Sequence, residues 1–331
     1  MKKRRFLFML FIVVLGGCTA DDNNTPIPEE SDLPSNSSLL GEWTKKANYP
    51  GFQTEDPFSF TIGDRAYVGG ANGATEFWEY DKSKDKWERK AEIGVVRNNR
   101  VSFSIGNKGY AGLGRGFGAI AYEFYEYDPV ADRWSLLDNP LFVDDPSSFP
   151  LGFSIGNKGY VINGNTGDLG TEMHEYNAAN DSWRKKANFP IAYLDGGVAF
   201  SVGNKGYVGT GAGPGTGSPL TNQFWQYDPA TDEWKRLGDF GGAKRWLAVG
   251  FSIGNKGYIG TGSSDRATLC DFWEYNPGKD EWVEKASFKG GVRHSAVGFS
   301  IGNKGYLGLG SHNVPNIPFQ RNDFWEFDPN K

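Results

Sequence analysis

The sequence predicts an all-β protein assembled from six copies of one four-stranded sheet. Glycine accounts for 46 of the 331 residues and aromatic residues for 15%, and glycine-rich turns with many aromatic residues are typical of β proteins. The motif Gly-Asn-Lys-Gly-Tyr occurs five times, after a degenerate copy, Gly-Asp-Arg-Ala-Tyr. No stretch keeps the apolar spacing of a helix, which repeats about every 3.6 residues, so helices should be few.

The motif tyrosines set the length of the repeat. Their successive spacings are 43, 50, 47, 51 and 48 residues, and they are Tyr67, Tyr110, Tyr160, Tyr207, Tyr258 and Tyr306. Each copy is expected to hold four strands, A to D. In the last copy, strand A is Val297–Ile301, which alternates large and small residues. Asn303-Lys304-Gly305 is expected to form the tight turn to strand B, Tyr306–Gly310. Strand C is Phe324–Phe327, and a turn such as Asp228–Asp232 leads to strand D.

Strand D carries a tryptophan at a fixed distance after a tyrosine of strand C. The pairs are Tyr80/Trp87, Tyr127/Trp134, Tyr176/Trp183, Tyr227/Trp234 and Tyr275/Trp282. With a period of about 50 residues and a glycine-rich strand B, this pattern resembles the kelch family over residues 42–331. Most copies have Gly-x-Gly where many kelch repeats have Gly-Gly, and only Gly69-Gly70 matches directly. The resemblance implies a six-bladed β-propeller, whose sheets pack radially around an axis.

The missing strand D of the last copy is expected at the other end of the chain. Trp43–Pro50 matches Trp183–Pro190 at six of eight positions, so an N-terminal strand should complete the sixth blade. Closure of this kind leaves no blade half-built and protects the strand edges. The propeller is therefore expected to span residues 40–331.

The first residues indicate an export signal. Met1–Arg5 is basic, and Phe6–Leu15 is an apolar run shorter than the roughly 20 residues that span a bilayer. Leu15-Gly16-Gly17-Cys18 resembles the bacterial lipobox, which implies removal of residues 1–17, acylation of Cys18, and anchoring through the lipid alone at the bacterial outer membrane or cell surface. An ordinary secretory signal with a chance cysteine is the alternative. Residues 18–39 are expected to be a flexible tether.

Charge and cysteine content exclude several classes of protein. The formal net charge is −5, and it becomes −9 without the four basic residues of the signal. An acidic protein has no counterion-release route to phosphate backbones, so nucleic acid is not expected as a partner. If Cys18 is acylated, no intrachain disulfide can form, and Cys270 is expected to be an inert small residue. No phosphate loop or nucleophile elbow is present, so no cofactor is implied.

The D–A and B–C loops lie at one end of every blade and differ in each copy, so recognition is expected there. Counting back 13 residues from each motif tyrosine gives Thr54, Arg97, Ser147, Leu194, Arg245 and Arg293. In kelch propellers that bind acidic peptides, an arginine at the matching position points into the mouth of the central channel. Arg97, Arg245 and Arg293 are therefore candidate ligand-binding residues, because a guanidinium suits carboxylates and stacks on rings. A local salt bridge with Glu55, Asp195 or another carboxylate is the alternative.

Two further slots complete the candidate site. The slot after the arginines holds Glu55, Asn98, Ser148, Asp195, Trp246 and His294. Trp246 could be a stacking platform for a sugar or a packing residue of the blade, and Glu55, Asp195 and His294 join the candidate mouth. The slot before strand C is acidic in five of six copies: Glu76, Glu123, Glu172, Gln223, Asp271 and Asp323. These acids are expected to bond free backbone N–H groups.

The sequence favours a non-catalytic module that binds a glycan or a protein. His174 occupies an aromatic slot of strand C, and His294 and His312 alone do not make a metal site. The alternative is a sugar mutarotase or epimerase that resembles the six-bladed kelch sialic-acid mutarotases, which bind an acidic sugar with arginine and carboxylate in the channel mouth. A purely structural envelope scaffold is a third possibility, since fold does not imply function.

Overall fold

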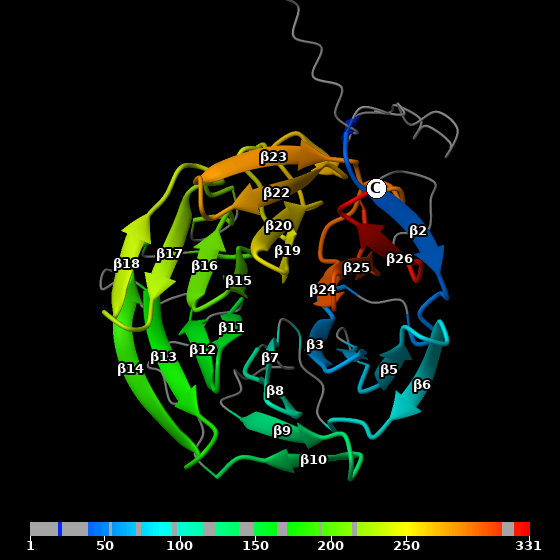
Figure 1. Ribbon diagram of the computed structural model, residues 1–331, viewed down its shortest axis with the longest axis vertical. Coiled ribbons are helices and arrows are strands. Elements are labelled where there is room, and N and C mark those ends of the chain that lie inside the picture. The colour runs from blue at the N-terminus through cyan, green and yellow to red at the C-terminus, as the bar shows by residue number, and fades with distance from the viewer. Residues whose placement is uncertain are drawn as a thin grey trace, which may run out of the picture.

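The protein is a six-bladed β-propeller, so the predicted fold class is confirmed. The computed structural model describes residues 19–21, 39–52, 55–70, 74–94, 98, 100–114, 123–138, 149–163, 171–191, 194–213, 217–312 and 321–331. These residues form six four-stranded antiparallel sheets around one axis (Figure 1) and no helix. Over the same residues, there is consequently no helical segment of the length and apolarity needed to cross a membrane.

Each blade runs from the axis outward. Blade 1 is β3 (Phe58–Ile62), β4 (Arg65–Gly69), β5 (Phe77–Asp81) and β6 (Lys86–Lys90); blade 2 is β7 (Val101–Ile105), β8 (Lys108–Gly112), β9 (Phe124–Asp128) and β10 (Arg133–Leu136). Blade 3 is β11 (Leu151–Ile155), β12 (Lys158–Asn163), β13 (Thr171–Asn177) and β14 (Ser182–Phe189); blade 4 is β15 (Val198–Val202), β16 (Lys205–Gly209), β17 (Phe224–Asp228) and β18 (Glu233–Arg236). Blade 5 is β19 (Val249–Ile253), β20 (Lys256–Gly260), β22 (Phe272–Asn276) and β23 (Glu281–Lys285), and blade 6 is β24 (Val297–Ile301), β25 (Lys304–Gly308), β26 (Phe324–Asp328) and β2 (Glu42–Lys46).

The tight turn between strands A and B lies earlier than the sequence suggested. In blade 6 it is Gly302–Asn303, and β25 begins at Lys304. Gly302 has a positive φ of 63° while Asn303 does not, which is the two-residue hairpin geometry with glycine in the first central position. The second glycine of the motif therefore lies inside strand B and has another role.

That second glycine allows neighbouring blades to approach closely. A Cβ atom on Gly206 would lie 2.4 Å from the Phe153 ring, which belongs to strand A of the preceding blade. The same clash, at 2.1–2.7 Å from a phenylalanine of the blade before, would occur at Gly109, Gly159, Gly257 and Gly305. The repeated glycine and the repeated phenylalanine are thus two halves of one contact between blades, which repeats around the ring.

The N-terminal strand closes the ring as predicted. Strand β2 pairs antiparallel with β26 in a register that places Trp43 opposite Phe327. The Trp43 side chain is 5% exposed, packs edge-on against Phe272 and Phe288 of blade 5, and donates its indole N–H to the Ala286 carbonyl at 2.9 Å. One side chain therefore joins the two ends of the chain and the neighbouring blade.

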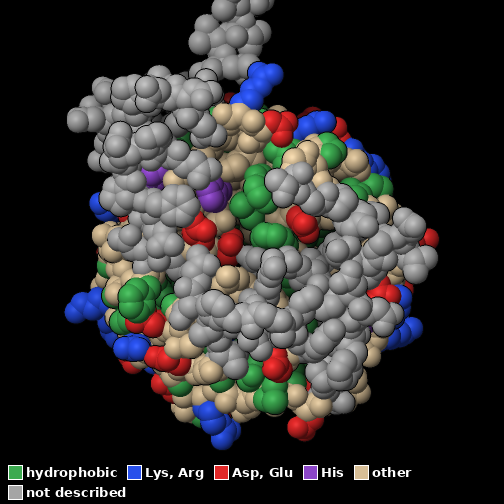
Figure 2. Space-filling view, turned by 180° about the vertical axis from the view of Figure 1, so that it is seen from behind, with side chains coloured by type: hydrophobic (Ala, Val, Ile, Leu, Met, Phe, Trp, Pro, Cys, Tyr) green, Lys and Arg blue, Asp and Glu red, His purple; other side chains and the backbone are tan. Residues whose placement is uncertain are grey.

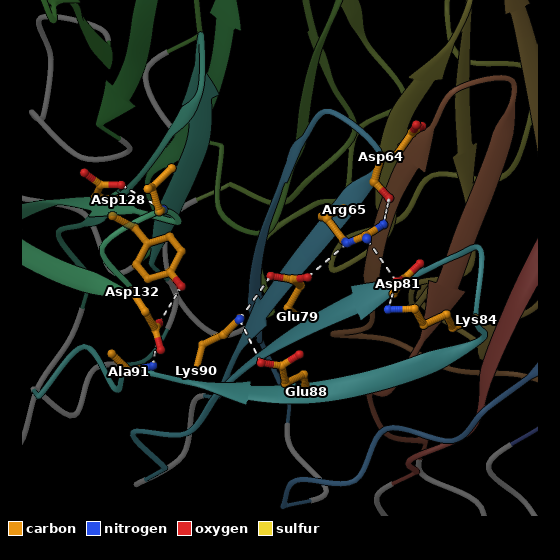
Figure 3. A network of polar contacts seen from close by, with 12 residues as sticks. Asp64, Arg65, Glu79, Asp81, Lys84, Glu88, Lys90, Ala91, Asp128 and Asp132 are labelled. Carbon is orange, nitrogen blue, oxygen red and sulfur yellow. Dashed lines mark hydrogen bonds and ion pairs between the residues drawn. The ribbon is translucent and has the colours of Figure 1, made fainter.

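Adjacent blades are also joined at their outer edges by a repeated aspartate. Asp132 accepts the Tyr127 hydroxyl at 2.7 Å and the backbone N–H of Ala91 in blade 1 at 2.9 Å (Figure 3). Trp134 donates its indole N–H to the Ala91 carbonyl. The equivalent carboxylates, each bonded to a tyrosine of its own blade and a backbone N–H of the preceding one, are Asp85, Asp181, Asp232 and Asp280.

The junction between blades 5 and 6 uses a different acceptor. Blade 6 has Phe327 in place of the tyrosine, and the Ala286 N–H donates to the Leu40 carbonyl instead of a carboxylate. Gly41 follows with φ 117°, and a Cβ there would lie 2.4 Å from the Phe327 ring. The segment that enters β2 therefore substitutes with its backbone for the missing turn of blade 6.

Candidate functional site

The residues that lead into strand A form a rim on the side of the D–A and B–C loops, which we call the loop face. Gly196, Leu247, Ser295 and Asp56 are equivalent residues of blades 4, 5, 6 and 1, and all have positive φ between 51° and 60°. The Asp56 N–H donates to the Ser295 carbonyl, Ser295 to Leu247, and Leu247 to Gly196. This chain of backbone bonds crosses the junction of blades 6 and 1, so it reinforces ring closure at the loop face.

Three of the predicted mouth residues precede the rim residues. Asp195, Trp246 and His294 each exchange two backbone hydrogen bonds with a residue beyond strand B of their own blade, namely Ala212, Ser263 and Ser311. Glu55 precedes Asp56 in the same way along the chain. The structure therefore brings Glu55, Asp195, Trp246 and His294 to the loop face, with Glu55, Asp195 and Trp246 partly exposed and His294 buried.

The arginines of the same slot lie inside the protein. Arg293 is 0% exposed and forms a two-pronged ion pair with Asp323 at 2.9 and 3.0 Å. Its remaining donors bond the carbonyls of Leu309, Gly290 and Gly291, and the guanidinium covers the Phe288 ring. All of its N–H groups are thus used within blade 6.

Arg245 repeats this arrangement in blade 5. It is 0% exposed and pairs with Asp271 at 2.6 Å through both oxygens, above the Phe240 ring. The local ion pair, one of the two alternatives, is therefore what the structure contains for Arg245 and Arg293. Four of the five N–H groups of Arg245 make these or other hydrogen bonds within the protein, and neither guanidinium is exposed to a ligand. Arg97 lies outside the described residues.

The acids before strand C are the partners of these arginines. Asp271 and Asp323 also accept the indole N–H of Trp273 and Trp325, whereas Glu76, whose blade has Thr54 in the arginine slot, accepts the Phe52 backbone N–H as expected. Blade 4 lacks both charges, because it has Leu194 and Gln223 at the two positions. Arginine and acid are therefore absent together in blade 4.

Among the described residues, the exposed charge near the axis is acidic. In the space-filling view of the loop face, acidic side chains lie near the middle, and the visible Lys and Arg side chains lie at the edge (Figure 2). Burial raises the pKa of Asp56 to about 6; the Glu55 charge also raises it, and a hydrogen bond with Ser295 lowers it. Burial likewise raises the pKa of Asp195.

The raised pKa of Asp56 makes stability depend on pH. The pKa rises from 3.8 in the unfolded chain to about 6 in the folded protein, so folding favours the protonated acid. The contribution of Asp56 is most favourable below pH 4 and falls by about 3 kcal/mol as the pH rises through 6. Asp56→Asn should remove this term. The difference in unfolding free energy between variant and wild type, measured by urea denaturation, should grow from pH 4 to pH 7; a constant difference would contradict the assignment.

The histidines and Cys270 lie in the interior. His174 is buried in β13, as expected, and burial lowers its pKa. His294 contacts the hydroxyls of Ser295 and Ser311 at 3.3 and 3.4 Å, all within the interior. Across the described ranges, no three His, Cys, Asp or Glu side chains gather as metal ligands would. Cys270 is fully buried and disulfide-bonded, so its sulfur is no nucleophile. Cys18 lies outside the described residues.

A short strand of the expected tether lies against the loop face. Strand β1 (Thr19–Asp21) pairs antiparallel with β21 (Ala267–Leu269) in the B–C connection of blade 5. The structure describes every residue of this connection, and β21 is buried.

Sequence reasoning missed one charged residue of the loop face. Arg321 lies two residues before Asp323, beside Arg293, and its side chain is partly exposed. The signal was present in the repeat, because the equivalent positions of the other copies carry no charge: Ala74, Ala121, Gly170, Thr221 and Leu269. Comparison with protein-family models and with curated proteins finds no match to this chain, so the assignment of its function depends on the geometry above.

Proposed function

We propose that the protein is a non-catalytic, kelch-type recognition module that binds a glycan or a protein through its loop face. The observation that carries this proposal is the difference between the two sides of the ring. The outer-edge junctions repeat the same aspartate contacts from blade to blade, whereas each D–A and B–C connection has its own residues. Variation on a rigid frame is how propellers and other scaffolds carry binding sites.

Exposed aromatic side chains on the loop face support binding. Phe52 is 71% exposed, and Trp246 is partly exposed at the rim. Aromatic rings bury much surface at little entropic cost and can stack on sugar rings or on protein side chains. The net charge of the mature chain keeps nucleic acid outside the proposal.

A glycan array and an interaction screen with the mature protein test this proposal. Phe52→Ala and Trp246→Ala should each weaken binding of any ligand found. Val283→Ala, at an exposed position of the outer strand β23, is the matched control and should leave binding unchanged. Absence of any ligand, or equal binding by all three variants, would overturn the proposal.

We further propose that Cys18 carries a lipid that holds the module at the bacterial outer membrane or cell surface. This anchor would exclude the disulfide that the structure gives Cys270, because a sulfur in a thioether cannot also form a disulfide and the sequence has only two cysteines. The membrane-extracted protein should therefore show one thiol per chain, from Cys270. Because Cys270 is fully buried, a thiol reagent should count it only after unfolding. No thiol after unfolding without reductant, together with an unmodified N-terminal peptide in mass spectrometry, would rule out the anchor.

A sugar mutarotase is the second candidate, because one observation favours it. Asp56 lies at the rim with a pKa of about 6, and a carboxyl group that titrates near the working pH is suited to general acid–base catalysis. NMR exchange spectroscopy of N-acetylneuraminate anomers tests this activity directly. Exchange above the uncatalysed rate that Asp56→Asn abolishes would favour the enzyme over the binding module.

A further inference from the structure

Arg321 lies in the B–C connection of blade 6, shortly before β26 begins at Phe324. Its backbone N–H donates to the Gly310 carbonyl at 3.0 Å, and the next residue, Asn322, accepts the Tyr49 N–H at 2.8 Å. Gly310 in turn lies against the backbone of His294, because a Cβ on Gly310 would be 2.5 Å from the His294 oxygen. The backbone of Arg321 is thus fixed at the loop face, beside the slot that holds Arg293 and His294.

Arg321 makes no side-chain hydrogen bond or ion pair with the residues that the structure describes. Its Nε atom is buried and makes no hydrogen bond, and no carboxylate of the described residues forms an ion pair with it. The nearest acid, Asp323, already gives both oxygens to Arg293 and one of them also to the indole of Trp325. Since both oxygens already face Arg293, Arg321 cannot share this acid in the two-pronged geometry that guanidinium groups favour.

The local charge is consequently positive by one unit, with two arginines and one aspartate. Burial lowers the pKa of Arg321, the nearby Arg293 lowers it further, and only Asp323 opposes them. The acids of the loop face, Glu55, Asp56 and Asp195, do not contribute to the pKa shift of Arg321. A partly buried cation whose Nε makes no hydrogen bond costs some stability unless an anion completes it, and such costs are typical of functional positions.

We propose that Arg321 is an anion-binding residue and that it takes the carboxylate of a ligand whose remaining body is uncharged, such as a uronic acid. One net positive charge matches one carboxylate. A ligand with several carboxylates would be repelled by the acidic rim described above. This inference rests on the proposed function, because it names the class of ligand that the loop face would bind.

Binding of paired probes tests the inference. Isothermal titration with D-glucuronate and D-glucose compares the same ring with and without the charge, and an Asp-Glu-Asp peptide tests the polyanionic alternative. The wild type should bind glucuronate at least tenfold more tightly than glucose or the peptide, since a charge-assisted pair is worth about that factor or more. Arg321→Gln should lose this preference. Arg266→Gln, an exposed arginine of the blade 5 connection, should keep it.

A measurement without ligand tests the same residue independently. If the Arg321 charge stays unpaired until a ligand binds, Arg321→Gln removes an uncompensated charge and should raise the melting temperature by about 2 °C. If Arg321 instead supports the fold, the variant should melt lower, and this result would overturn the inference. Equal affinity of wild type and variant for glucuronate would also overturn it, as would tighter binding of the peptide. A neutral ligand that needs Phe52 and Trp246 but not Arg321 would refute this site and leave the proposed function intact.

Discussion

Replacing Trp43 with alanine is expected to lower the free energy of unfolding by about 3–5 kcal/mol. The indole fills the space between blades 5 and 6, where it contacts three phenylalanine rings, and it donates to the Ala286 carbonyl. Truncation leaves a cavity at the one junction that joins the two ends of the chain. Urea denaturation followed by circular dichroism measures the loss.

Thr44 provides the control for this experiment. It is the next residue of β2, and its side chain is exposed. Thr44→Ala should change the unfolding free energy by no more than about 0.5 kcal/mol, as is usual for surface substitutions. If Trp43→Ala were as mild as Thr44→Ala, β2 would not be what holds the ring closed, and the structure of blade 6 would need revision.

Breaking the buried ion pair of blade 5 should have an effect of similar size. Asp271→Asn leaves the Arg245 guanidinium, which is 0% exposed, without its charge partner, and removal of one member of a buried pair costs about 3–5 kcal/mol. Thermal and urea unfolding should both show the loss, because the packing of Phe240 against the guanidinium depends on the same pair.

Blade 4 supplies the matched replacement. It carries Leu194 and Gln223 at the equivalent positions, so Arg245→Leu with Asp271→Gln transfers its uncharged pair into blade 5. The double variant should recover most of the stability, since well-packed neutral groups often replace a buried ion pair at little cost. A double variant as unstable as Asp271→Asn would show that the blades do not exchange these pairs.

Most of the fold could be predicted because the same packing contacts repeat from blade to blade. The repeated tyrosine and tryptophan, the aspartate of the C–D turn and the Trp43 segment each recur at fixed spacing, and the structure shows them in contact. The exact turn could not be read, since both glycines of the motif can adopt positive φ in principle. Only the closeness of the preceding blade's phenylalanine shows that the second glycine is a packing residue.

The candidate site was predicted less completely, because its ion pairs join residues far apart in the sequence. The spacing located the rim residues on one face, yet it could not show whether Arg245 and Arg293 point outward or inward. Their partners Asp271 and Asp323 are 26 and 30 residues away, and the repeat pattern predicted a backbone role for those acids. Arg321 was missed because it interrupts the repeat instead of following it.

The two roles of the N-terminal segment decide where the protein could be cut without unfolding. Leu40 and Trp43 hold the end of blade 5 through Ala286. Ala47 donates its N–H to the aspartate of blade 1 and accepts the indole N–H of the blade 1 tryptophan. Proteolysis before Leu40 would release an intact, closed ring from any membrane anchor. Proteolysis within β2 would instead remove the outer strand and its contacts to both neighbours, and so would release a ring that opens. A shed, functional form of this protein must therefore begin at or before Leu40.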